Sequence, residues 1–185
     1  MNLGHVLVFG GTGMLSKATA WIVEHATQTT VFGRNFKRLL QIKKNSSGNK
    51  LEVRELDYTN ISALKDEIKY SFTQYGPIDM VVSWIHGTAP EAIPTIKQQI
   101  SQLQNKHWTF LHVKGSSSNL DSIVSKEKTH SEQYSIKEVR LGFIYNDTFS
   151  RWLTNEEISN GVIQAIKNEK QITTIGTLYP WEKRP

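Results

Sequence analysis

The chain has 185 residues, of which 38% are hydrophobic and 21% are charged, and its formal net charge is +5. This length accommodates one hydrophobic core and is short for two domains. The sequence contains no cysteine, which excludes disulfides, thiolate zinc sites and cysteine nucleophiles. No apolar run approaches the ~20 residues that span a bilayer, and the chain does not begin with the basic and apolar regions of a signal peptide, so we expect a cytoplasmic protein without membrane segments.

Strand-like and helix-like segments alternate in chain order. Short β-branched and aromatic runs predict strands at residues 5–10, 30–33, 51–56, 78–85, 108–113, 136–144 and 171–175. Apolar residues at helical spacing predict helices at 14–26, 36–44, 61–75, 91–106, 120–128 and 154–167. This alternation predicts an α/β fold over residues 1–185: one doubly wound Rossmann domain, with a seven-stranded, mostly parallel sheet and helices on both faces.

A glycine-rich turn joins the first predicted strand to the first predicted helix. It consists of Gly10, Gly11, Thr12, Gly13, Met14 and Leu15. Glycine allows a sharp turn and lets a pyrophosphate approach bare backbone, and the amides and dipole at a helix start attract such an anion. We therefore predict that this turn binds a dinucleotide, the alternative being a tight turn that holds no ligand.

The end of the second predicted strand indicates which dinucleotide binds. A site that prefers NAD usually places an acidic residue there to bind the ribose hydroxyls, whereas this chain has Arg34 and Asn35 and no acidic residue from Gln28 to Gln41. Arg34 offers a planar cation suited to a 2′-phosphate, with Lys37 and Arg38 nearby. The expected cofactor is therefore NADP(H), NAD(H) being the second choice.

This same group is the densest cluster of positive charge in the chain, since the other basic residues are scattered. Nucleic-acid binding requires a concentrated patch. The distribution therefore argues against a nucleic-acid partner and favours a nucleotide phosphate, with a solvated helix face as the alternative.

These residues resemble the short-chain dehydrogenase/reductase family, and more closely its extended and atypical branches. Gly10, Gly13 and Ser16 have the spacing of the family's GxxGxxG turn, with serine in place of the third glycine. Asp57, followed by Tyr58, falls where the family has an aspartate beside the adenine ring. The resemblance covers most of the chain by element order, but only the first ~60 residues by motif. It implies a nicotinamide dinucleotide cofactor, with Asp57 and Tyr58 near the adenine.

The family's catalytic residues have only a partial counterpart. Family members use a serine after the fifth strand and a Tyr-x-x-x-Lys pair on the next helix, in which the lysine lowers the tyrosine pKa. Ser116 and Ser117 supply the serine, but Tyr134 and Lys137 are three residues apart at the entry to a predicted strand, where their side chains should face opposite sides. Tyr179 and Lys183 have the spacing but lie beyond the last predicted strand and enclose a proline.

Other residues at the carboxyl ends of the strands are candidates for the missing functions. The fourth predicted strand leads into Ser83, Trp84 and His86, where the family often has Asn-Ala-Gly lining the cofactor. Trp84 is expected to pack on a cofactor ring, and His86 can act as an acid or base. Lys114 can take over the ribose or phosphate contact of the missing lysine. Ser116, His86 and Lys114 are therefore the candidate catalytic residues. Each assignment has a structural alternative: His86 only hydrogen-bonds a loop carbonyl, Trp84 belongs to the core, and Lys114 is a solvated surface lysine.

Two functions remain open at this point. One is an NADP(H)-dependent oxidoreductase acting on an unidentified small carbonyl or alcohol compound; the other is a catalytically inactive NADP(H)-binding sensor or interaction module. The six histidines are dispersed without metal-ligand spacing, so no metal site is expected. The family often forms dimers or tetramers, so a homo-oligomer is compatible with the resemblance.

Overall fold

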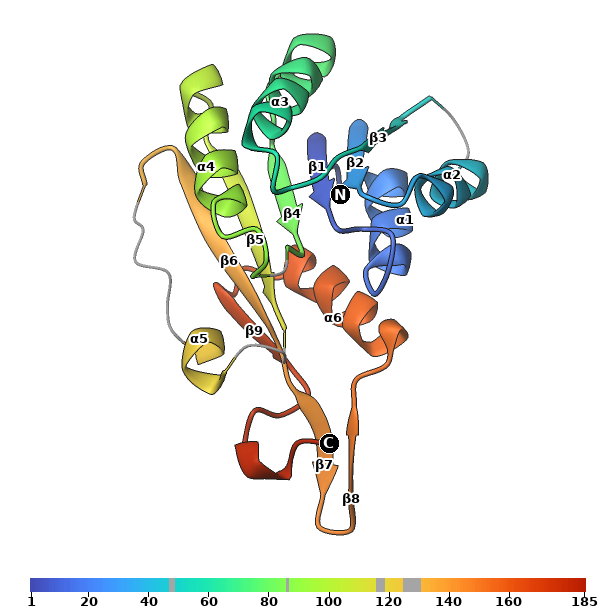
Figure 1. Cartoon of the computed structure of the whole chain (residues 1–185), viewed down its shortest axis with the longest axis vertical. Coiled ribbons are helices and arrows are strands. Elements are labelled where there is room, and N and C mark those ends of the chain that lie inside the picture. Colours follow the sequence, from blue (N-terminus) through green and yellow to red (C-terminus); the bar gives the residue numbers. More distant parts are fainter. Residues whose placement is uncertain (47–48, 86, 116–118, 125–130) are drawn as a thin grey trace.

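A computed structural model describes residues 1–46, 49–85, 87–115, 119–124 and 131–185. Its main sheet has seven strands in the order β3-β2-β1-β4-β5-β6-β9 (Figure 1), and every neighbouring pair is parallel. The strands are β1 (His5–Phe9), β2 (Gln28–Gly33), β3 (Leu51–Glu55), β4 (Met80–Ser83), β5 (Trp108–Lys114), β6 (Tyr134–Leu141) and β9 (Ile172–Ile175). The predicted doubly wound α/β fold with a seven-stranded parallel sheet is confirmed.

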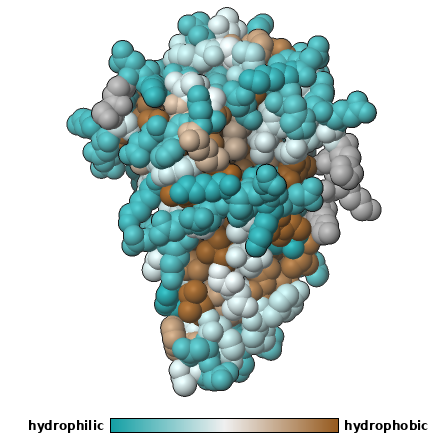
Figure 2. Space-filling view, turned by 180° about the vertical axis from the view of Figure 1, so that it is seen from behind, coloured by the Kyte–Doolittle hydropathy of each residue, from teal (hydrophilic) through white to brown (hydrophobic). Residues whose placement is uncertain are grey.

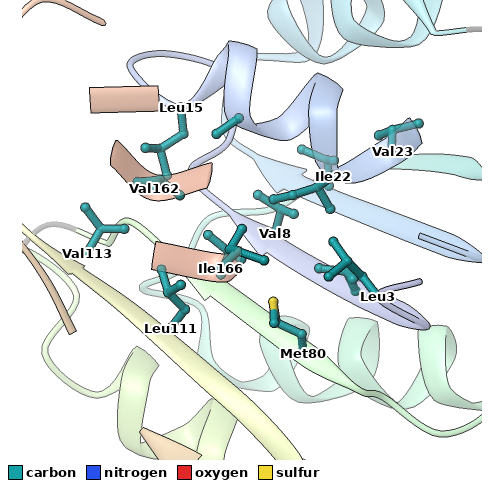
Figure 3. Packing of buried hydrophobic residues seen from close by; sticks show 14 of the residues in the cluster. Leu3, Val8, Leu15, Ile22, Val23, Met80, Leu111, Val113, Val162 and Ile166 are labelled. Carbon is teal, nitrogen blue, oxygen red and sulfur yellow. The ribbon is translucent and has the colours of Figure 1, made fainter. Parts of the chain in front are cut away.

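The helices cover both faces of this sheet, and each face has its own core. Alternate residues of a strand point to opposite faces, so Val6 and Val8 join one hydrophobic cluster while Leu7 and Phe9 join the other. The first cluster lies under α1 (Ser16–His25), α2 (Phe36–Asn45) and α6 (Asn155–Lys167), as Figure 3 shows for its packing around Val8 and Ile166. The second lies under α3 (Ile61–Tyr75) and α4 (Ala92–Leu103).

Helix α6 begins with a capping box. The Thr154 hydroxyl accepts from the Glu157 N–H at 3.2 Å, and the Glu157 carboxylate accepts from the Thr154 N–H at 2.8 Å. Two N–H groups at the helix start are thereby satisfied by side chains. The cap sets where α6 begins, and α6 in turn packs beside α1.

Two elements differ from the sequence prediction. The strand predicted at 136–144 is interrupted at Gly142, where a Cβ would come 2.0 Å from the Thr177 carbonyl oxygen. The chain then forms an antiparallel hairpin of β7 (Phe143–Asn146) and β8 (Phe149–Trp152), which was not predicted. The Asn146 side chain closes its turn by accepting from the N–H groups of Thr148 and Phe149. This hairpin projects beyond the carboxyl edge of the sheet (Figure 1).

The connection between β5 and β6 contains α5 (Leu120–Val124), which coincides with the described part of the helix predicted at 120–128; the rest of that range lies outside the described residues. The chain ends after a 3-10 helix, η1 (Trp181–Lys183). Among the described residues, no helix is both long and apolar enough to cross a membrane.

Candidate functional site

The strand order reverses between β1 and β4, so the carboxyl ends of these strands border the crevice where doubly wound folds bind ligands. Gly10 follows β1 with a positive φ of 79°, and a Cβ on it would meet the Trp84 carbonyl oxygen at 2.2 Å. Both facts require glycine there. Gly10 therefore allows the turn after β1 to pass close to the chain that leaves β4.

The turn itself is held from behind by its carbonyl groups. The buried Thr19 hydroxyl donates to the Gly11 carbonyl at 2.9 Å, and the Ser159 hydroxyl of α6 donates to the Met14 carbonyl at 2.8 Å. A Cβ on Gly11 would come 2.5 Å from the Thr19 hydroxyl, whereas a Cβ on Gly13 would meet no atom within 4 Å. Gly11 thus serves close packing against α1, and Gly13 leaves the outer side of the turn open.

An open groove of about 720 Å³ runs along the outer side of this turn. The lining residues come from the ends of β1, β2 and β4, from the start of α2 and from the segment after β3: Gly10, Thr12, Gly13, Met14, Gly33, Arg34, Asn35, Arg38, Tyr58 and Trp84. The first N–H of α1, that of Ser16, donates back to the Gly13 carbonyl at 2.9 Å. Eight predicted cofactor residues are therefore brought together: Gly10, Thr12, Gly13, Met14, Arg34, Asn35, Tyr58 and Trp84.

The other predicted cofactor residues have different surroundings. Leu15 and Ser83 are fully buried, Leu15 within the core under α1. Asp57 is exposed, and its carboxylate accepts from the N–H and the hydroxyl of Thr59. These hydrogen bonds, with a smaller contribution from the charge of Arg34, hold the Asp57 pKa below its usual range. Like Gly11, none of these three side chains is among the residues that line the groove.

The charged end of the groove is formed by Arg34 and Arg38, both exposed. Asn35 caps α2 between them, since its side chain accepts from the Arg38 N–H at 3.1 Å. Among the described residues, none of those lining the groove is acidic. The sequence indicated Arg34 as the phosphate ligand; Arg38, one helical turn further along, is brought to the same groove by the cap.

Tyr58 forms the floor of the groove rather than a reactive group. Its hydroxyl accepts from the Gly10 N–H and donates to the Phe32 carbonyl, both at 2.7 Å. Burial raises the pKa of this phenol to about 12, against smaller opposing effects of the Gly10 hydrogen bond and the Arg34 charge. A phenol held neutral in this way joins the ends of β1 and β2 beneath the groove.

A second, smaller cavity of about 230 Å³ lies beyond Trp84, between the ends of β4 and β5 and the helices α4 and α5. Trp84 borders both spaces. A Cβ on Gly115 would come 2.1 Å from the Trp84 Cη2 atom, so the indole lies directly against the backbone after β5. Trp84 therefore forms the wall between the groove and the cavity. Seen from behind, hydrophobic surface gathers in the lower half of the molecule, towards which the sheet strands point (Figure 2).

Lys114 lies at the cavity and not at the groove, and its ammonium is held in a buried charge cluster. Its Nζ donates to Glu138 Oε1 at 3.0 Å, while Arg140 donates to Glu138 Oε2 from Nε at 3.0 Å and from Nη2 at 2.7 Å. Glu138 is 4% exposed. The solvated-lysine alternative is therefore wrong. Sequence reasoning missed Glu138 and Arg140, although their spacing of two in a strand placed them on one face.

The structure separates Tyr134 from Lys137 as the strand prediction requires. Tyr134 packs against Trp108, with ring centroids 4.9 Å apart, on the α4 side of the sheet. The Lys137 ammonium donates to the Ala165 and Asn168 carbonyls of α6 on the other side. The candidates His86, Ser116 and Ser117 lie outside the described residues.

No protein-family model matches the sequence, and none of the curated proteins is significantly similar to it. Solved structures are similar in their backbone. A short-chain type dehydrogenase/reductase from Mycobacterium marinum matches with a TM-score of 0.70 and 15% identity over 97% of this chain and 96% of that one. The chain has the short-chain dehydrogenase/reductase fold.

Two further structures with this fold give comparable matches at 15% identity. A betaketoacyl-ACP reductase from Bacteroides thetaiotaomicron has a TM-score of 0.68 over 94% of each chain. A serine dehydrogenase from Escherichia coli has a TM-score of 0.66 over 94% of this chain and 96% of that one. Such low identities establish the backbone arrangement and leave the chemistry to the residues of this chain.

Proposed function

We propose that the chain binds NADP(H) in the groove and exchanges a hydride with a small carbonyl or alcohol compound in the cavity beyond Trp84. The observation that carries the proposal is the combination of an open glycine turn with two arginines at one groove. Bare backbone at Gly13 suits a pyrophosphate, and the planar guanidinium of Arg34 suits a 2′-phosphate. The fold shared with dehydrogenases and reductases adds support.

The hydride-exchange step is supported by the cavity adjoining the groove, since Trp84 borders both spaces. A bound NADPH supplies a hydride to a carbonyl carbon, whose oxygen takes up a proton from water, and NADP⁺ and an alcohol result. Because a hydride passes only between carbons in direct contact, the nicotinamide and the substrate would have to meet at the edge of the indole of Trp84, which borders both the groove and the cavity. A cavity of about 230 Å³ is below the usual 300–1,000 Å³ of ligand pockets, so the substrate is small.

The cofactor assignment is tested by titrating the protein with NADPH and with NADH. The Arg34→Ala variant should bind NADPH roughly 10- to 100-fold more weakly, because a charged hydrogen bond to phosphate is lost, and should bind NADH as before. Lys37→Ala is the matched control, since it removes a neighbouring cation that does not line the groove, and it should leave both affinities unchanged. Equal losses for both nucleotides in Arg34→Ala would reject the NADP(H) preference.

A non-catalytic binding module is the second candidate function. The observation favouring it is that Tyr134 and Lys137 lie on opposite sides of the sheet. Incubation with NADPH and a panel of small carbonyl compounds separates the two functions. NADPH consumption that depends on the carbonyl compound supports the oxidoreductase, whereas tight NADPH binding without consumption supports the module.

A further inference from the structure

A buried histidine lies at the amino edge of the sheet, at the opposite end of β1 from the glycine turn. His5 is the first residue of β1 and is 3% exposed. Its backbone N–H donates to Asp79 Oδ2 at 2.9 Å, and a Cβ on the preceding Gly4 would come 2.1 Å from that same oxygen. The start of β1 is therefore packed closely against the segment that leads into β4.

The hydrogen bond of the His5 imidazole determines which tautomer the neutral ring adopts. Its Nδ1 lies 3.0 Å from the carbonyl oxygen of Gly76, the residue after α3. A carbonyl oxygen only accepts, so Nδ1 carries the proton and donates it, and Nε2 has a bare lone pair. Nε2 is buried, and among the residues that the structure describes it has no hydrogen-bond partner. A second proton on the ring would therefore create a buried N–H without an acceptor, which is costly.

The nearest charged group, Asp79, only partly opposes this cost. Its carboxylate attracts a proton to His5, but it already accepts from the His5 backbone N–H and forms an ion pair with the Lys106 ammonium at 2.5 Å. Burial lowers the pKa of His5 below its usual 6.5, against smaller opposing effects of the Gly76 hydrogen bond and the Asp79 charge. The folded protein thus favours the neutral imidazole.

The other titratable group beside the ring is Tyr75, at the end of α3. Its ring lies at 76° to the imidazole, with the ring centroids 5.7 Å apart. Glu52 and Arg54 lie beyond Tyr75 and form an ion pair with each other at 3.9 Å. These two charges are of opposite sign, so together they add little that would favour a second cation at His5.

We propose that His5, Gly76 and Asp79 form an acid-sensitive latch: the neutral imidazole holds the start of β1 against the end of α3, and protonation of Nε2 releases it and lowers the stability of the fold. The latch is independent of the proposed function, because it lies at the opposite edge of the sheet from the groove and the cavity. Its contribution to stability is complete above the unfolded pKa of 6.5 and is lost as the pH falls through the lower folded pKa.

The test compares the urea unfolding of the wild type and of His5→Asn at about pH 7.5 and about pH 5. The asparagine amide can still donate to the Gly76 carbonyl, but it takes up no proton. The ratio of the wild-type unfolding constant to that of the variant should rise roughly fivefold or more as the pH is lowered, the effect of one buried N–H without an acceptor. Parallel profiles for the two proteins would overturn the proposal.

Two further variants sharpen this comparison. His107→Gln is the matched control, since His107 is exposed and its two ring nitrogens contact the Glu132 carbonyl and the Ser135 hydroxyl, and it should follow the wild-type profile. Asp79→Asn removes the charge that attracts a proton to His5, so it should lose more stability between the two pH values than the wild type does. A smaller loss in Asp79→Asn would contradict the latch.

The wild type alone decides the matter if His5→Asn does not fold. The NMR shifts of the ring carbons report both the tautomer and the protonation of each histidine. His5 should show a proton on Nδ1 and should stay neutral at pH values where a histidine in a short unfolded peptide is already protonated. A proton on Nε2 of the neutral ring, or protonation at the same pH as in the peptide, would show that there is no latch.

Discussion

The two halves of the carboxyl edge of the sheet are built in different ways. The half at β1 and β2 is a backbone site: the Gly10 conformation, the Gly11 packing and the open Gly13 shape a groove to which side chains add charge. The half at β4, β5 and β6 is a side-chain site, with Trp84 as its wall and Lys114 in a buried ion cluster. A backbone site leaves a readable glycine pattern in the sequence, whereas a side-chain site depends on which residues meet across strands.

The largest expected effect separates the two roles of glycine in the backbone half. Gly10→Ala forces a side chain into a positive φ and against the Trp84 carbonyl, so it should lower the free energy of unfolding by about 3 kcal/mol or more. Gly13→Ala meets no atom within 4 Å and should change it by less than about 0.5 kcal/mol, while weakening NADPH binding about tenfold. Urea unfolding measures the stability of both variants, and NADPH titration measures the affinity of Gly13→Ala. A wild-type NADPH affinity in Gly13→Ala would show that the pyrophosphate does not lie over this turn.

The next effect tests whether Trp84 is held by the backbone after β5. Gly115→Ala should cost about 1–3 kcal/mol, because its methyl group overlaps the indole of Trp84. In a Trp84→Ala background the same substitution should cost much less, since the overlapping ring is gone. A double-mutant cycle measured by urea unfolding gives the coupling, expected to exceed about 1 kcal/mol. Additive costs would mean that the indole is not seated on Gly115.

Replacing Tyr58, on the floor of the groove, should have a smaller effect on stability. Tyr58→Phe removes the hydroxyl that joins Gly10 to Phe32 and should cost about 1–2 kcal/mol. The folded-state pKa of Tyr58 is raised from 10.0 to about 12, so its contribution is complete below pH 10 and is lost as the pH rises towards 12. Unfolding measured across this range should show the wild type losing more stability than the variant, and parallel profiles would contradict this role.

The smallest effect concerns α6, which supports the turn through Ser159. Hydrogen bonds from Arg151, and then from the Thr154 N–H, lower the pKa of Glu157 from 4.5 to about 2. The contribution of a lowered carboxyl pKa is present above the unfolded pKa and is lost as the pH falls through the folded one. Glu157→Gln should therefore lower the unfolding temperature slightly at pH 7, with the difference disappearing towards pH 2. A difference that persists at pH 2 would assign the effect to packing of the side chain.

Much of the backbone half could be predicted from the sequence, because its signals are local. The strand before Gly10, the helix after Leu15 and the arginine after Gly33 are neighbours in the chain, and the predicted residues that line the groove follow from that order. Leu15 and Ser83 were assigned to the cofactor by position alone. Whether a residue next to a site faces the ligand or the core depends on the strand or helix face, and a shift of one residue reverses it.

The side-chain half could be predicted only in outline. Lys114 was correctly located at the end of β5, but its partners lie 24 and 26 positions later in the chain, and the alignment of β5 with β6 brings them together. The hairpin of β7 and β8 was missed because the apolar run around Gly142 continues without a polar break. The close approach of Gly142 to Thr177 that interrupts it is a long-range contact.

The amino-acid sequence alone determined the alternation of strands and helices, the glycine turn and the cation that follows the second strand, since each depends on the spacing of residues close along the chain. The tertiary structure alone decided that Trp84 divides the site, that Gly115 supports it and that Lys114 shares a carboxylate with Arg140. These relations join residues on different strands. The physical reason is that backbone conformation responds to neighbouring residues, whereas burial and ion pairing respond to whatever the packed sheet brings into contact.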